Sequence, residues 1–235
     1  MFGSHRTPVS ISKDGLSITL KRVDEFFFYR RESSDGIVEK VLLEAPEEII
    51  LDPVEPLNTP SRITPHLLIG FSKAVVARPH STRTIFLKFP VEIGVILSGG
   101  DKDDVLDVIS LPHKKFTLYG TPRGGHVCRF WQSDVFAAAP ETDPLYEGVL
   151  GLDIRNESDE WVTVNRVVFD VHGMKIYYKK NLVSARGKMT VISERTAETE
   201  FIDSPLAKGM KRAIELFKEG RLAVSSSRFH MGEGL

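Results

Sequence analysis

Cysteine and long apolar runs are the two features that this 235-residue chain has least of. The single cysteine, Cys128, excludes an internal disulfide, which is typical of proteins from a reducing compartment. Apolar runs such as Val95-Ile96-Leu97 are far too short to cross a bilayer. No apolar signal-peptide core follows the first residues, Met1 to Pro8. We therefore predict a cytoplasmic protein without a transmembrane segment.

An excess of charge of one sign is also absent. The chain has 31 basic and 32 acidic residues, so its net charge is −1 and does not attract it to nucleic acid or anionic lipid. The sequence contains no Gly-x-Ser-x-Gly nucleophile motif, no His-Glu-x-x-His zinc motif and no P-loop. We therefore expect no nucleic-acid partner and no cofactor, and we favour a protein that is not an enzyme.

Alternating apolar residues dominate the segment Thr84–Leu97, around which the rest of the chain is organised. Every odd-numbered residue from Ile85 to Leu97 is apolar, whereas the even-numbered residues are mixed and partly charged. A period of two places one face of an extended strand against a core. Because Pro90 has no backbone N–H, we expect a bend there, with two shorter strands that share one core face.

Many short strands between turn signals predict a mainly β fold of the antiparallel β-sandwich type, built as one large sandwich or as two small ones. We divide the chain into a β-rich N-terminal half (1–115), a sandwich-like C-terminal half (116–202), an amphipathic helix (203–222) and a tail (223–235). The alternation in segment 161–171 changes phase at Asn165-Arg166. This change predicts a β-bulge, or a strand that crosses between two sheets.

The C-terminal region carries the one convincing helical pattern. Ser204 is the expected N-cap, Pro205 occupies the first helical position, and Gly220 ends the helix. Apolar residues follow at spacings of three and four and form one stripe: Leu206, Met210, Ala213, Ile214 and Phe217. We expect this stripe to pack on the sheet, with docking on a membrane or a partner as the alternative.

A glycine-containing turn is the most suggestive candidate for ligand binding. Two adjacent glycines allow backbone N–H groups to approach an anion, and flanking arginines supply positive charge. The predicted ligand-binding residues are Arg123, Gly124, Gly125, His126 and Arg129. The pattern lacks both the P-loop lysine and a following helix, so a plain hairpin turn is the alternative.

Two metal sites are conceivable from residue types, and we favour neither. His126 and Cys128 lie two residues apart on one strand face, with His113 as a third zinc ligand, but the paired spacing of zinc sites is missing. Four aspartates suggest a calcium site, because calcium prefers carboxylate oxygens: Asp101, Asp103, Asp104 and Asp107. The glycine and the distal glutamate of a calcium-binding loop are missing, however. We predict a buried thiol and a solvated acidic hairpin tip, and therefore no metal.

The segment Leu118–Gly125, which leads into Cys128-Arg129-Phe130 and lies downstream of Phe89–Ile93, resembles the archaeal domain of unknown function 432 family. The opening Met1-Phe2-Gly3 fits the same family, and the resemblance covers nearly the whole chain. It implies an archaeal, non-secreted protein that acts beside a membrane channel. The family has no established activity, so the resemblance transfers no catalytic residue.

Two hypotheses for the function follow. The first is a non-enzymatic binding or regulatory β-module, with a protein partner or self-association through exposed sheet edges. The second is a small-ligand or metal-dependent enzyme with its site at the hairpin Arg123–Arg129. Peripheral contact with a membrane stays open under both hypotheses. The two are separated by whether Arg123, His126 and His113 converge on one pocket.

Overall fold

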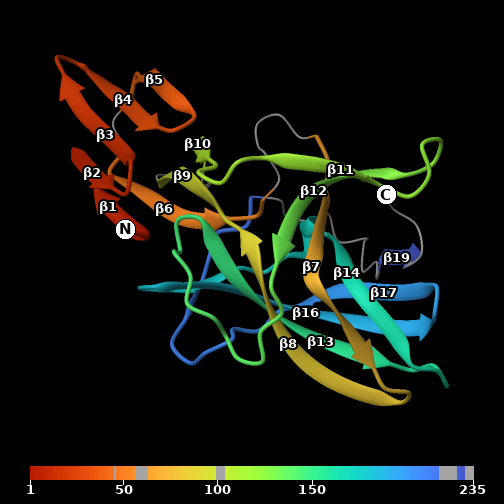
Figure 1. Ribbon diagram of the computed structural model, residues 1–235. Helices are drawn as coiled ribbons and strands as arrows, with labels where there is room; N and C mark the ends of the chain where they lie inside the picture. Colours follow the sequence, from red (N-terminus) through yellow and green to blue (C-terminus); the bar gives the residue numbers. More distant parts are fainter. Residues whose placement is uncertain (45, 57–62, 99–103, 217–226, 231–235) are drawn as a thin grey trace.

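The structure is a computed structural model that describes residues 1–44, 46–56, 63–98, 104–216 and 227–230, the last of these by backbone only. The described chain is built mainly of strands, with one 3-10 turn, η1 (Val171–Gly173). Figure 1 shows a smaller group of sheets at the upper left and a larger two-layered group at the lower right. Among the described residues, no helix is long and apolar enough to cross a membrane.

The smaller group consists of two four-stranded antiparallel sheets. One is a meander of β2 (Val9–Lys13), β3 (Leu16–Val23), β4 (Phe26–Ser33) and β5 (Gly36–Leu42). The other has the order β1 (Gly3–Arg6), β6 (Glu48–Val54), β9 (Glu92–Ser98) and β10 (Asp104–Ile109). Alternate residues of these strands form a shared core that includes Leu16, Ile18 and Leu20 opposite Leu51, Ile93 and Val95.

The larger group is a sandwich of two mixed sheets. One sheet has the order β11 (Lys115–Tyr119), β12 (His126–Ser133), β7 (His66–Ala77) and β14 (Val162–Asp170). The other has the order β18 (Lys211–Arg212), β15 (Tyr177–Lys179), β16 (Leu182–Ser193), β13 (Glu147–Asn156) and β8 (Ser81–Pro90). Two further strands extend it, because β17 (Thr196–Ile202) pairs with β16 and β19 (Ser227–His230) pairs with β17.

The mainly β prediction is confirmed, and most strand pairs are antiparallel. Two pairs are parallel, however: β12 with β7, and β13 with β16. The alternation of a strand does not encode the direction of its neighbour, so the sequence did not predict these pairs.

The segment Thr84–Leu97 joins the two groups. Strand β8 ends at Pro90 and β9 begins at Glu92, which confirms the predicted interruption. The two strands do not share one core face. Leu87 and Phe89 of β8 enter the core of the larger sandwich, whereas Ile93 and Val95 of β9 enter the core of the smaller group.

The phase change predicted in β14 is present as a register shift. The pairing of β14 with β7 is interrupted between Val164 and Arg166, and both Val164 and Val167 are nevertheless buried. The division of the chain into halves at residue 115 stays a prediction. The two core clusters interleave along the chain, since one draws on residues 16–111 and 145 and the other on residues 67–91 and 150–213.

The predicted helix over 203–222 is wrong for residues 203–216, which are extended or form turns, while residues 217–222 lie outside the described residues. Lys211 and Arg212 pair with β15 as strand β18. The backbone N–H of Ile214 donates to the Asp52 carboxylate (2.9 Å), and that of Leu216 donates to Glu55 (3.4 Å). Partners from distant strands therefore replace the hydrogen bonds that a helix would make within itself.

Candidate ligand-binding site

The hairpin between β11 and β12 contains the turn that the sequence analysis selected. Both glycine amides are already used within this turn, because the N–H groups of Gly124 and Gly125 donate to the Thr121 carbonyl at 3.2 and 2.7 Å. A Cβ at position 125 would lie 2.7 Å from two backbone oxygens, so close backbone packing is the reason for this glycine. The side chain of Arg123 is exposed at the turn.

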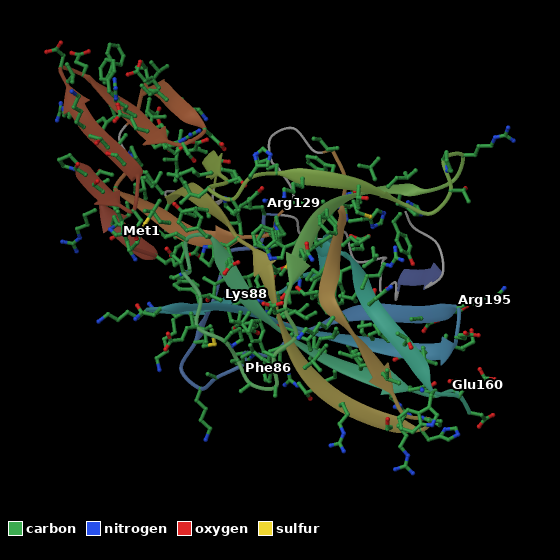
Figure 2. All side chains as sticks on the ribbon, viewed as in Figure 1. Met1, Phe86, Lys88, Arg129, Glu160 and Arg195 are labelled. Carbon is green, nitrogen blue, oxygen red and sulfur yellow. The ribbon has the colours of Figure 1, made fainter. Side chains whose placement is uncertain are left out.

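Arg129 lies away from this exposed turn, in the interior (Figure 2). Its side chain is 1% exposed and forms an ion pair with Glu92, also 1% exposed, at 2.5 Å. A second guanidinium nitrogen donates to the Ser110 hydroxyl at 3.1 Å. Burial lowers the pKa of Arg129, and the neighbouring Glu92 carboxylate opposes that shift. Arg129 therefore links β12 of the larger sandwich to the beginning of β9.

The three residues weighed as zinc ligands lie in different surroundings. Cys128 is fully buried, and burial raises the pKa of its thiol to about 12, which keeps it protonated at neutral pH. The exposed His126 packs edge-to-face against His66, with ring centroids 4.8 Å apart. His113 lines a separate pocket. Among the described residues, no three histidine, cysteine or carboxylate side chains are grouped so as to hold a metal ion.

The aspartates considered for calcium are only partly described. Asp101 and Asp103 lie outside the described residues. Asp107 accepts hydrogen bonds from the Tyr29 hydroxyl (2.9 Å) and from the Arg31 guanidinium (3.1 Å), so it ties β10 to the meander sheet. A structural ion pair therefore accounts for Asp107. Arg123, His126 and His113 do not converge on a described pocket. Ligand binding by the hairpin residues stays a prediction.

A pocket of about 500 Å³ lies where the two groups of sheets meet, and we call it the junction pocket. Strand β11 accompanies β12 only as far as Phe130, and the chain that leads into β11 comes from Leu111. Among the described strands, none pairs with this edge of β12 beyond Phe130. Three aromatic side chains contribute to the walls: Phe130, Trp131 and Tyr146. Polar side chains line the remainder: His113, Lys115, Gln132 and Glu147.

Trp131 supplies the feature of this pocket that most indicates a ligand. Its indole Nε1 is buried and has no hydrogen-bond partner in the described part of the chain. A buried indole N–H without an acceptor is unfavourable, because water has been removed and nothing replaces it. The neighbouring polar groups are partly occupied: Glu147 pairs with Lys88 at 2.8 Å, and the Tyr146 hydroxyl donates to the Asp14 carbonyl at 3.3 Å. A ligand acceptor would satisfy this donor once the indole moves, because Nε1 has no accessible surface in this structure.

Comparison with known protein families assigns the chain to one of them. A family model described as protein of unknown function, DUF432, matches residues 1–232. The chain belongs to the DUF432 family. No curated protein and no solved structure matches this DUF432 member.

Sequence reasoning about this DUF432 chain missed Trp131, Gln132 and Tyr146. The local signal was an aromatic pair, Phe130-Trp131, followed directly by an amide side chain. That signal is weak, because aromatic residues in strands usually serve a core. Only the fold brings residues 111–115 and 146–147 to the same edge of β12.

Proposed function

We propose that this protein is a binding module whose junction pocket holds a small cyclic compound with a flat face and hydrogen-bonding groups on its rim. The buried, unpartnered Nε1 of Trp131 carries the proposal. It develops the binding-module hypothesis from the sequence and gives that hypothesis a site. Sugars and nucleosides share this chemistry, and the experiment below distinguishes them.

The pocket walls support a ring-shaped ligand. Trp131, Phe130 and Tyr146 contribute aromatic side chains to the walls, and such walls favour a ring-shaped ligand at low entropic cost. The amide of Gln132 provides both donors and an acceptor, and Lys115 provides a cationic donor. A few polar groups within aromatic walls set the orientation of a ligand, while the walls supply most of the buried area.

The position of the pocket supports a regulatory role for the bound compound. Its lining residues include Leu111 and Tyr146, which pack in the core of the smaller group, as well as residues of β12 and β13 from the larger group, so a ligand contacts both groups of sheets. The Arg129–Glu92 pair crosses the same boundary. Occupation of the pocket would therefore favour one arrangement of the two groups, and a protein partner could respond to it. The archaeal source, the cytoplasmic location and the partner stay predictions.

Tryptophan fluorescence provides a direct test, because the chain has only two tryptophans, Trp131 and Trp161. Trp161 is 65% exposed and does not line the pocket, so the Trp161→Phe variant leaves Trp131 as the single emitter. We expect saturable changes in its emission on titration with members of one of two panels, monosaccharides or nucleosides. The panel that responds identifies the class of ligand.

Calorimetry of the responding compound provides the control. Trp131→Phe keeps an aromatic wall but removes the N–H donor, and we expect about three- to tenfold weaker binding, the value of one neutral hydrogen bond. Trp161→Phe should bind as the wild type does. The proposal is wrong if neither panel changes the Trp131 emission, or if Trp131→Phe binds with unchanged affinity.

A further inference from the structure

A second cavity opens at the side of the larger sandwich, between β7 and β8. These strands follow each other in the chain but lie in opposite layers, joined by the turn at residues 78–80 (Figure 1). The cavity has a volume of about 580 Å³. Its walls are mainly apolar: Val75, Val76, Ala77, Ile85, Val135 and Phe136. We call it the lateral opening.

The lateral opening leads into the sandwich core. Val75, Ala77, Ile85 and Val135 are partly buried and pack against that core. The segment after β12 closes part of the gap between the layers, because Phe136 exchanges two backbone hydrogen bonds of 2.9 Å with Phe86. The gap toward the turn at residues 78–80 has no such bridge among the described residues and remains accessible.

Two arginines stand at this opening. Arg83 lies on the core-facing side of β8, which also carries the fully buried Leu87 and Phe89. Its partner on the neighbouring strand is the buried Ile154. A guanidinium at a core-facing position is tolerated only where it reaches solvent or an anion. Arg83 is exposed, and Arg78 also lines the opening. Within the described part of the chain, neither guanidinium forms an ion pair or a hydrogen bond.

We infer that the lateral opening binds a free single-chain amphiphile with one anionic head group, such as a fatty acid. The apolar walls would cover the chain, and Arg78 with Arg83 would bind the carboxylate, for which guanidinium geometry is well suited. At roughly 30 Å³ for each water-sized group, the cavity has room for roughly twenty such groups. One acyl chain with its carboxylate has about this many groups, whereas a lipid with two chains has about twice as many.

Fluorescence titration with cis-parinaric acid and with its methyl ester tests this inference. Both probes brighten in an apolar site, but only the acid carries a charge. We expect the wild-type protein to bind the acid at least about tenfold more tightly than the ester, as a charge-assisted contact requires. In the double variant Arg78→Gln/Arg83→Gln the two probes should bind with equal affinity. Arg22→Gln, which removes an exposed arginine from β3 in the smaller group of sheets, should behave as the wild type does.

A substitution in the wall separates binding in the cavity from binding to surface charge. Val76 lines the opening and is 61% exposed, so Val76→Asp should leave folding intact while placing a negative charge at the rim of the opening. We expect weaker binding of both the acid and the ester, verified against an unchanged far-UV spectrum. Equal wild-type affinity for acid and ester, or an unaltered acid affinity in the double arginine variant, would overturn the inference.

Discussion

The buried ion pair between Arg129 and Glu92 allows a quantitative test of whether Arg129 has a structural role. Arg129→Met keeps much of the side-chain volume but removes the cation from a carboxylate that is 1% exposed. A buried charge that loses its counter-charge typically costs about 3–5 kcal/mol of unfolding free energy. We expect a loss of that size for this single substitution. Ser110 is little affected, because its hydroxyl also donates to the Pro112 carbonyl at 3.3 Å.

The double variant Arg129→Met/Glu92→Leu provides the decisive comparison. It removes both charges together, and such replacements are often neutral or stabilising. We therefore expect its unfolding free energy to lie within about 2 kcal/mol of the wild-type value, so that most of the cost of the single substitution is recovered. Urea denaturation of the wild type, both single variants and the double variant measures the coupling. A cost below about 1 kcal/mol for Arg129→Met, or a double variant as unstable as the sum of the singles, would refute the reasoning.

Two further predictions concern buried positions. Burial raises the pKa of Glu55 from 4.5 to about 7, so between these values the folded protein binds a proton that the unfolded chain does not, and stability falls as pH rises. Glu55→Gln should therefore be more stable than the wild type by about 3 kcal/mol at pH 8 and equal to it near pH 4.5, as measured by denaturant titration. If the unfolding free energies of the two proteins changed with pH in parallel, the prediction would be wrong. A Cβ at Gly148 would lie 2.4 Å from the buried Phe89 ring. Gly148→Ala should therefore lower the free energy of unfolding by about 1–3 kcal/mol, as measured by thermal unfolding. An unchanged melting temperature would show that the ring moves freely.

Local patterns predicted the strands of this protein well. The alternation in Thr84–Leu97 and the missing N–H of Pro90 were enough to place β8 and β9, and the phase change near Asn165 was enough to predict the irregularity in β14. Each of these features depends on a residue and its immediate neighbours, which is why sequence reasoning finds it.

The helix over 203–222 shows where such patterns fail. Apolar spacings of three and four, with a capping serine and a proline, satisfy the rules for an isolated helix. The described part of this segment is extended instead, because Asp52 and Glu55 bind its amides from positions 162 and 161 residues away. Propensity is a weak preference, and long-range hydrogen bonds together with burial outweighed it.

Arg129 shows the same limit for function. Its position close to Gly124 and Gly125 in the sequence suggests an anion-binding residue. Consecutive strand residues point to opposite faces, however, and the side chain of Arg129 points inward to Glu92. The residues of the junction pocket, by contrast, carried no clear signal individually. Trp131 becomes a candidate only because its Nε1 is buried without an acceptor, a fact that depends on every atom around it.

The sequence by itself determined that the chain forms many short strands, that the odd-numbered residues from Leu87 to Val95 face a core and that the chain belongs to the DUF432 family. Only the tertiary structure decided which strands pair, which of them run parallel, and which polar groups meet at the junction pocket and the lateral opening. The physical reason is the range of the interactions. Alternation follows from backbone geometry within a few residues, whereas pairing and pockets depend on contacts between segments far apart in the chain, to which single residue types contribute little signal.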